Sequence, residues 1–319
     1  MICSRFFVSI ILVIVAGLAV NPGLGQNYPS KPIRMLTSPV GGGNDFVARV
    51  IAPGISGPLG QQVIIDNRPN RAVPDGMQKS APDGYTVMLM SGGLWLFPFM
   101  ANVNYDMARD FAPISLAASA PNVVVVHPSL PVRSVKDLIA LAKAKPGQLN
   151  YSVGGLGGMS HLSVELFKIM SGINMVLVNY KSGSQEIADL VGGQVQLAFN
   201  PAASASPHVK SGKLRGLAVT TSEPSALFPG LPTIAASGLP GYEAMSTYGV
   251  LAPAKTPEAI IKRINQEVVR FVNTPEAKER FLNGATEPIG SSPEVFAAFI
   301  RSDMSKWGKI IKDSGIRDE

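Results

Sequence analysis

The chain repeats one hydrophobic pattern from about residue 33 onward: a short apolar run, a loop that carries Gly or Ser, and a helical stretch. The apolar runs are bounded by turn residues, as is typical of buried strands. Residues 67–81 form a polar stretch with room for one irregular helix. We predict strands at 33–37, 62–66, 86–90, 123–126, 149–153, 175–179, 195–199 and 214–219, and helices at 45–55, 135–144, 160–170, 185–191, 257–272, 275–282 and 293–312.

Strands that alternate with helices predict an α/β fold with mainly parallel sheets. The 319 residues, of which 46% are hydrophobic, can bury a large core and favour two domains over one. In such folds ligands bind at the C-terminal ends of strands, near a switch in strand order. The glycine-bearing loops of this chain follow predicted strands, so we expect the ligand site among them.

Several helix ends carry recognisable caps. Ser134 precedes the helix at 135–144, and Pro146-Gly147 follows it. We expect Thr256 to cap the helix that starts at Pro257, and Ser184 to cap the helix at 185–191.

The first 25 residues have the composition of a secretory signal peptide. Arg5 precedes an apolar run at 6–20, and Gly23-Leu24-Gly25 offers small residues for cleavage near Gly25 or Gln26. A run of 15 apolar residues is shorter than the roughly 20 that a spanning helix needs, although an uncleaved anchor stays an alternative. We therefore expect an exported protein that is soluble after cleavage.

Cysteine content and charge exclude several classes of function. Cys3 is the single cysteine and lies inside the signal, so the mature chain has no disulfide and no thiolate chemistry. The formal net charge is +6, and removal of Arg5 leaves 27 basic against 22 acidic side chains. These charges are scattered instead of clustered, which argues against a nucleic-acid partner.

The first glycine turn is the most informative segment. Gly41-Gly42-Gly43 follows the strand at 33–37, and Asn44 or Asp45 can cap the next helix. The first N–H groups of that helix then point at whatever sits in the turn. No Lys or Arg occurs from Thr37 to Asp45, so the turn suits a small carboxylate better than a polyphosphate. An ordinary strand–turn–helix without ligand is the alternative.

Two further loops have the same design. Residues 150–162 run from a strand through four glycines into a helix start at Ser160, and residues 178–184 add a phenol and hydroxyls. Two such loops from different domains, facing each other, would clamp a dianion without a buried lysine. Ordinary α/β loops are again the alternative for each one alone.

A catalytic role finds little support in the residues. His127, His161 and His208 have no partner at metal-ligand spacing, and we interpret His161 as a neutral side chain that can hold its loop by a hydrogen bond. The chain lacks a G-x-S-x-G elbow, a phosphate-binding P-loop and a dinucleotide fingerprint. We therefore expect no enzyme activity, no cofactor and no metal. Trp95 and Phe97 could line the site, although core packing is the simpler role.

The ordered motifs of the chain resemble those of the Bug family, the periplasmic solute-binding receptors of tripartite tricarboxylate transporters. The resemblance covers essentially the whole mature chain. Its marks are Tyr28-Pro29-Ser30-Lys31-Pro32-Ile33, Pro39-Val40-Gly41-Gly42-Gly43-Asn44-Asp45, Asp66-Asn67-Arg68-Pro69, Ala81-Pro82-Asp83-Gly84-Tyr85-Thr86, Asp110-Phe111-Ala112-Pro113, Asn150-Tyr151, His161-Leu162, Gly192-Gly193-Gln194-Val195, Gly212-Lys213-Leu214-Arg215, Pro232-Thr233 and Leu239-Pro240-Gly241-Tyr242.

The resemblance implies a two-domain (Venus flytrap) architecture whose cleft closes on a small carboxylic acid. After a signal peptide at 1–25, it implies one domain from 26–122 and 250–319 and a second from 123–249. The ligand would be held largely by backbone amides and bridging waters. Carried over, the first wall is Ser38, Val40, Gly42, Gly43, Asn44 and Asp45; the second is Ser152, Val153, Gly155, Gly157, Gly158 and Met159; Tyr180, Asn200, Ser91 and Gly92 lie nearby.

The same resemblance implies the partners. The receptor would deliver its acid to the membrane subunits of a tripartite tricarboxylate transporter. Two alternatives stay open: a ligand sensor for a membrane signalling protein, and an exported enzyme on a similar scaffold.

Some positions depart from the family pattern. Ser38 replaces an aromatic residue, Val153, Gly158 and Met159 replace hydroxyl residues, and the stretch after Asn67-Arg68-Pro69 is short and carries Arg71 and Pro74. Fewer side-chain donors and an added thioether favour a ligand with one carboxylate and an apolar or aromatic body, not citrate.

Overall fold

The computed structural model describes residues 28–40, 43–180 and 183–317. The predicted signal peptide and Gly42 lie outside these ranges. Within them, the protein has no helix whose length and apolar character would let it cross a membrane.

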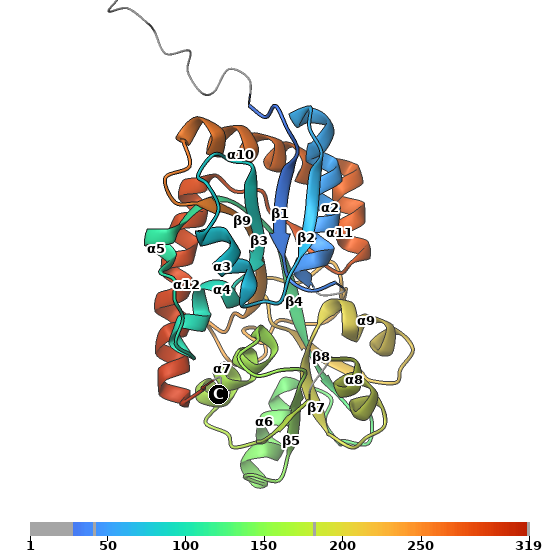
Figure 1. Cartoon of the computed structure of the whole chain (residues 1–319). Coiled ribbons are helices and arrows are strands. Elements are labelled where there is room, and N and C mark those ends of the chain that lie inside the picture. Colours follow the sequence, from blue (N-terminus) through green and yellow to red (C-terminus); the bar gives the residue numbers. More distant parts are fainter. Residues whose placement is uncertain (1–27, 41–42, 181–182, 318–319) are drawn as a thin grey trace, which may run out of the picture.

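The strands form one continuous path through two α/β domains, with the order β2-β1-β3-β9-β4-β7-β5-β6 (Figure 1). β10 and β8 also pair with β4, which belongs to both domains. The strands are β1 (Ile33–Thr37), β2 (Val63–Asn67), β3 (Thr86–Ser91), β4 (Phe111–Val126), β5 (Asn150–Val153), β6 (Val176–Asn179), β7 (Leu197–Pro201), β8 (Arg215–Val219), β9 (Met245–Pro253) and β10 (Glu287–Pro288).

Helices cover both faces of this path. Those of the first domain are α2 (Gly43–Leu59), α3 (Ala72–Gln78), α4 (Gly93–Leu96), α5 (Met107–Asp110), α10 (Glu258–Val272), α11 (Pro275–Asn283) and α12 (Pro293–Ser314), with a 3₁₀ turn at Phe97–Phe99. Those of the second domain are α6 (Val135–Ala144), α7 (Met159–Ser171), α8 (Gly183–Val191) and α9 (Ala202–Lys210). α12 runs down the side of the first domain and reaches α7 (Figure 1).

Each domain has a parallel centre. β1 pairs in parallel with β2 and β3, and β5 pairs in parallel with β6 and β7. Two long antiparallel strands, β4 and β9, join these centres. The C-terminal ends of β1, β3 and β5 therefore open toward the junction of the domains, where α2, α4 and α7 begin.

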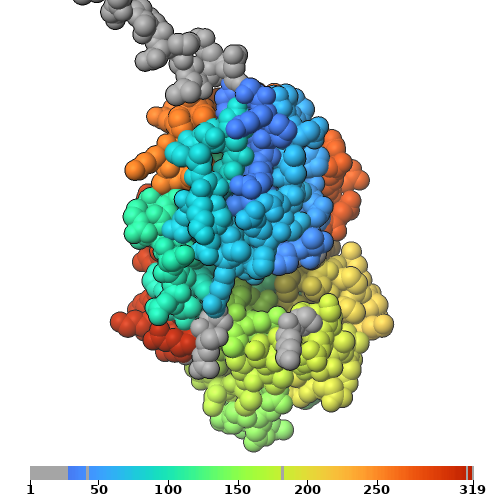
Figure 2. All heavy atoms as spheres, in the orientation of Figure 1, coloured from blue at the N-terminus to red at the C-terminus, as the bar shows by residue number. Residues whose placement is uncertain are grey.

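The change of domain occurs within β4. Its residues from Phe111 to Pro121 pair with β9, and those from Asn122 to Val126 pair with β7 and β8. At the crossing, the Asn122 N–H donates to Thr220 Oγ1 at 2.9 Å and the Thr220 N–H donates to the Asn122 carbonyl at 3.0 Å. The strand β4 thus belongs to both domains, whose surfaces lie one above the other in Figure 2.

Successive side chains of a strand point to opposite faces of the sheet, and here both faces are covered by helices, so the side chains on both faces are buried. Val87 and Leu89 of β3 pack with α2, α10 and α11, whereas Met88 and Met90 pack with α3, α4 and α12. In β4, Val123 and Val125 join one cluster and Val124 and Val126 join the other. A continuous apolar run is what such two-sided burial requires.

Most predicted elements are present, with ends that differ by a few residues. The helix at Val135–Ala144 is confirmed with its cap, since Ser134 Oγ accepts from the Asp137 N–H at 3.1 Å. The other two predicted caps are wrong. Pro257 occupies the cap of α10 while Thr256 Oγ1 donates to the Pro253 carbonyl, and Ser184 lies inside α8, which begins at Gly183.

The sequence did not indicate α4, α5, β9, α9, β10 or the first twelve residues of β4. Pro113 and Pro121 lie within β4 and break its sequence pattern, and the pairing with β9 shifts register beside Pro113. Gly249 lies within β9, where a Cβ would lie 2.0 Å from the Phe296 ring. Gly249 leaves room for the Phe296 ring, but in the sequence a glycine at this position indicates a loop and not a strand.

Candidate functional site

Two adjoining cavities lie where the domains meet. The large chamber has a volume of about 440 Å³ and the small chamber about 150 Å³. They share Asn44, Ser91, Gly93, Gly157 and Gly158, so one ligand can extend from one chamber into the other.

The small chamber is built from segments of both domains. α2 contributes Gly43 and Asn44, the β3–α4 turn contributes residues 91–93, and the start of α7 contributes residues 157–159. Two long helices thus begin at this chamber and direct their free N–H groups toward it. The remaining described lining residues are Leu96, Leu162, Ser246 and Tyr248, so none of the described lining residues carries a formal charge.

The first wall is fixed by side chains behind it. Asn44 Nδ2 donates to Ser38 Oγ at 2.6 Å, and Asn67 Nδ2 donates to the Ser38 carbonyl at 2.7 Å and to Asp45 Oδ1 at 2.8 Å. Asp45 is buried and forms an ion pair with Arg49 at 3.0 Å. Asn44 and Asp45 lie in the first turn of α2, not ahead of it. Asn44 faces the ligand space, whereas Ser38 and Asp45 support it.

The second wall is fixed by glycine geometry and one imidazole. Gly155 and Gly157 have φ values of 151° and 70°, which side chains rarely adopt. The Gly157 N–H donates to His161 Nδ1 at 3.2 Å. Burial lowers the pKa of His161, which keeps the imidazole neutral and able to accept at Nδ1. The predicted hydrogen bond by which His161 holds its loop is confirmed.

Behind this wall lies a second buried group of polar side chains. Ser152 Oγ donates to Glu186 Oε1 at 3.2 Å, and Asn200 Nδ2 donates to the same oxygen at 3.0 Å. Glu186 is 2% exposed, and burial raises its pKa. A Cβ at Gly154 would lie 3.0 Å from Glu186 Oε2, so this cluster packs directly under the loop.

The remaining predicted site residues are spread over different surroundings. Gly92 and Met159 line the small chamber. Val153 is fully buried in the core, and Val40 is 72% exposed. Tyr180 packs against the second-domain core, and its pKa is raised by burial and by its hydrogen bond with Asp189. Ser38, Val40, Asp45, Ser152, Val153, Gly155, Tyr180 and Asn200 are not among the described lining residues of either chamber.

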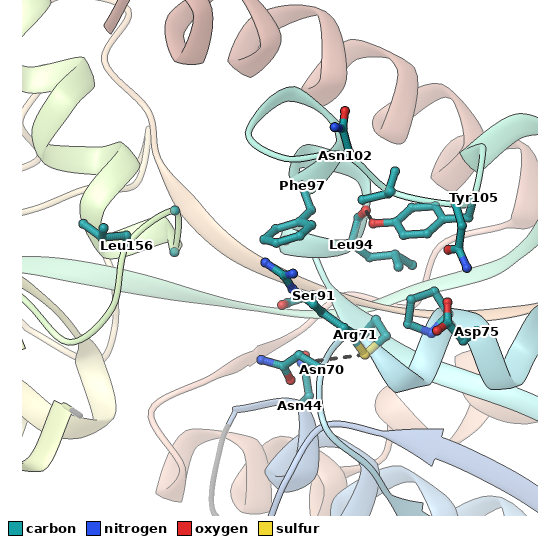
Figure 3. Close-up of a pocket in the computed structure, with 17 residues that line it drawn as sticks. Asn44, Asn70, Arg71, Asp75, Ser91, Leu94, Phe97, Asn102, Tyr105 and Leu156 are labelled. Atoms are coloured by element: carbon teal, nitrogen blue, oxygen red, sulfur yellow. Dashed lines mark hydrogen bonds between the residues drawn. The ribbon is translucent and has the colours of Figure 1, made fainter. Parts of the chain in front are cut away.

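The large chamber has a mixed lining with a large apolar part (Figure 3). The Arg71 guanidinium lies over the Phe97 ring, 5.1 Å from its centroid. Tyr105 donates its hydroxyl proton to the Leu94 carbonyl at 2.6 Å, which turns the ring toward the cavity wall. Leu156, from the second domain, faces these residues from the opposite side. Beyond the shared residues, the described lining consists of Asn70, Arg71, Pro74, Asp75, Met90, Leu94, Phe97, Asn102, Val103, Asn104, Tyr105 and Leu156.

The aromatic residues divide between core and site. Trp95 is fully buried, stacks edge-on against Phe296, and donates Nε1–H to Asp303 at 2.7 Å. Phe97 lines the large chamber. Sequence reasoning missed Ser246 and Tyr248, because they belong to the unrecognised strand β9. Within the described residues, no group of three or more His, Cys, Asp or Glu side chains could hold a metal ion.

Comparisons with known proteins agree on one family. Residues 47–316 match the family model described as "Tripartite tricarboxylate transporter family receptor". The chain is 32% identical to Protein BugT of Bordetella pertussis over 96% of both chains, and 33% identical to a UPF0065 protein of Pseudomonas sp. over 89% of this chain and 86% of that one.

Solved structures show the same relationship. The chain resembles R. palustris Rpa4515 with adipate, at 34% identity and a TM-score of 0.80, over 91% of this chain and 99% of that one. It also resembles the periplasmic binding protein BugD, at 26% identity and a TM-score of 0.77, over 92% of this chain and 100% of that one. The chain therefore belongs to the Bug family of tripartite tricarboxylate transporter receptors, which are periplasmic solute-binding proteins.

Proposed function

We propose that this protein captures a small carboxylic acid between its two domains and delivers it, unchanged, to the membrane subunits of a tripartite tricarboxylate transporter. One observation carries the proposal. Two glycine-bearing turns from opposite domains place the starts of two long helices at one small chamber whose described lining has no charged side chain. Backbone N–H groups at helix starts bind anions through partial positive charge.

The direct contacts are those that line the small chamber. We assign Gly43, Asn44, Ser91, Gly92, Gly157, Gly158 and Met159 to the ligand. We assign the buried Ser38, Asp45, Ser152 and Asn200 to support of the two walls, because their hydrogen bonds run to other protein groups. The family resemblance predicts domains of 26–122 with 250–319, and of 123–249. The pairing of β9 from Met245 onward favours a return to the first domain at the start of that strand.

The large chamber supports an acid with one carboxylate and an apolar body. Pro74, Met90, Leu94, Phe97 and Leu156 offer it a mostly hydrocarbon surface, and burial of such surface is worth about 25 cal/mol per Å². The relative R. palustris Rpa4515, 34% identical, is solved with adipate, whose aliphatic body supports the apolar part of this class, although adipate itself carries two carboxylates. Citrate, with three carboxylates, would place charge against the apolar wall.

Thermal unfolding tests the proposal. A ligand at ~100 times its Kd adds about 2.7 kcal/mol of stability, which should raise the Tm by roughly 5–10 °C in domains of this size. We expect this shift from an apolar monocarboxylic acid and not from its primary amide. Citrate that binds more than tenfold tighter than every monocarboxylate would overturn the ligand class, and no shift from any acid would overturn carboxylate capture.

Delivery needs its own test. Cells that express the transporter's membrane subunits should take up the identified acid only when this receptor is present. If the receptor binds the acid tightly in solution but uptake of the acid does not depend on the receptor, the alternative role as a ligand sensor for a membrane signalling protein is favoured.

A further inference from the structure

The small chamber has a third wall that belongs to neither glycine turn. Ser246 and Tyr248 are two residues apart on β9, so their side chains leave the strand on the same face. Both line the small chamber together with Gly43 and Gly158. β9 pairs with β3 on one side and with β4 on the other, so this wall stands on the centre of the sheet.

The Tyr248 hydroxyl lies directly against the start of α2. A Cβ added at Gly43 would lie 2.3 Å from the hydroxyl oxygen and 2.9 Å from the ring carbon that carries it. No real side chain tolerates such a distance, so glycine at position 43 makes room for this phenol. The hydroxyl therefore stands beside the N–H groups that open α2.

The chemistry of the phenol suits an anion. Burial raises the pKa of Tyr248 to about 12, against a smaller opposite effect of its hydrogen bond with Ser246. Because its pKa is raised, the phenol keeps its own proton at neutral pH and can donate it to a ligand.

We propose that the Tyr248 hydroxyl donates a hydrogen bond to the ligand carboxylate in the small chamber, as a third donor beside the starts of α2 and α7, and that Ser246 orients it. This inference rests on the proposed function. It deepens that function by adding a phenolic donor to a site in which backbone N–H groups are the main donors. Asn44 Oδ1, also in this chamber, is buried without a hydrogen-bond partner among the described residues, which marks the chamber as polar at this end.

Tyr248→Phe is the test, because it removes the hydroxyl and keeps the ring. We expect the Kd for a carboxylic acid that binds the wild type to rise about 10- to 100-fold, as for loss of a hydrogen bond to a charged group. The Kd for the matched amide, where measurable, should rise less. Tyr28→Phe is the control, since that hydroxyl donates to the Gly84 carbonyl at 2.7 Å, outside both chambers, and its Kd should match the wild type.

Calorimetric titration separates the possible failures. If the wild type binds no acid, the proposed function fails before this inference is reached. If the wild type binds an acid and Tyr248→Phe binds it within twofold of the same Kd, the inference is overturned. If Tyr248→Phe shows no cooperative unfolding, Ser246→Ala decides: a Kd at least about threefold higher supports an oriented phenol, and an unchanged Kd overturns it.

Discussion

The two helix starts that face each other across the small chamber are held in place by different forces. The first, at α2, depends on a network of charged and amide side chains in which buried Asp45 accepts from Asn67 and pairs with Arg49. The second, at α7, depends on two glycines with positive φ and on the neutral imidazole of His161. The same task, presentation of free N–H groups, is achieved once by electrostatics and once by backbone geometry.

This difference determines how each wall should fail. The first wall should be sensitive to loss of a buried charge, and the second to loss of a glycine or to a proton on His161. The following predictions test that contrast, from the largest expected effect to the smallest.

Asp45→Ala should destabilise the protein by about 2–3 kcal/mol, because it removes a buried carboxylate and leaves Asn67 Nδ2 without that acceptor. Arg49→Ala should cost less than Asp45→Ala, because the Arg49 side chain is half exposed and solvent screens its ion pair. Urea denaturation of both variants measures the two losses. Equal losses would show that the ion pair, and not the burial of Asp45, fixes this wall.

Gly157→Ala should destabilise the protein by about 1–2 kcal/mol, since φ is 70° at this residue and a side chain is strained there. A Cβ at this position would also lie 2.8 Å from Met100 Sδ. Gly158→Ala is the matched control, because φ is −72° and the nearest atom to its Cβ is 3.8 Å away. Equal stabilities of the two variants in urea would contradict a wall fixed by backbone geometry.

Acid should weaken the second wall slightly. Burial, and to a lesser degree Lys168, lowers the pKa of His161, while Glu165 acts in the opposite direction. Since the folded pKa lies below the unfolded value of about 6.5, the contribution of His161 to stability is fully present above pH 6.5 and is lost as pH falls through the folded pKa. We expect the acid's Kd to rise over the same range.

His161→Asn isolates this effect, because an amide oxygen can accept from the Gly157 N–H but does not titrate. The difference in unfolding free energy between the wild type and this variant should change with pH below 6.5 and be flat above it. Glu186, whose pKa burial raises, titrates with the opposite sign but equally in both proteins. His208→Asn, on α9, is the control, and a slope in the His161→Asn difference no larger than in this control would refute the prediction.

Local patterns in the sequence were sufficient for much of the fold. The helix Val135–Ala144 and its Ser134 cap follow from residues within a few positions of each other, as does the apolar run of β3. The two glycine turns were recognised because three or four glycines after a strand indicate a turn whose backbone adopts unusual conformations or approaches a neighbouring group closely. The family followed from motifs distributed over the whole chain, and the comparisons confirm it.

The sequence alone determined the alternation of strands and helices, the glycine turns at strand ends and the family. Each of these depends on short motifs whose residues are neighbours in the chain. Only the tertiary structure decided which side chains line the two chambers. It turned Ser152 and Asn200 toward Glu186, placed Arg71 over Phe97, and brought Tyr248 against Gly43, 205 positions away. Such contacts depend on the strand order and on the crossing of β4 between the domains. Neither can be predicted from the local pattern of apolar and polar residues.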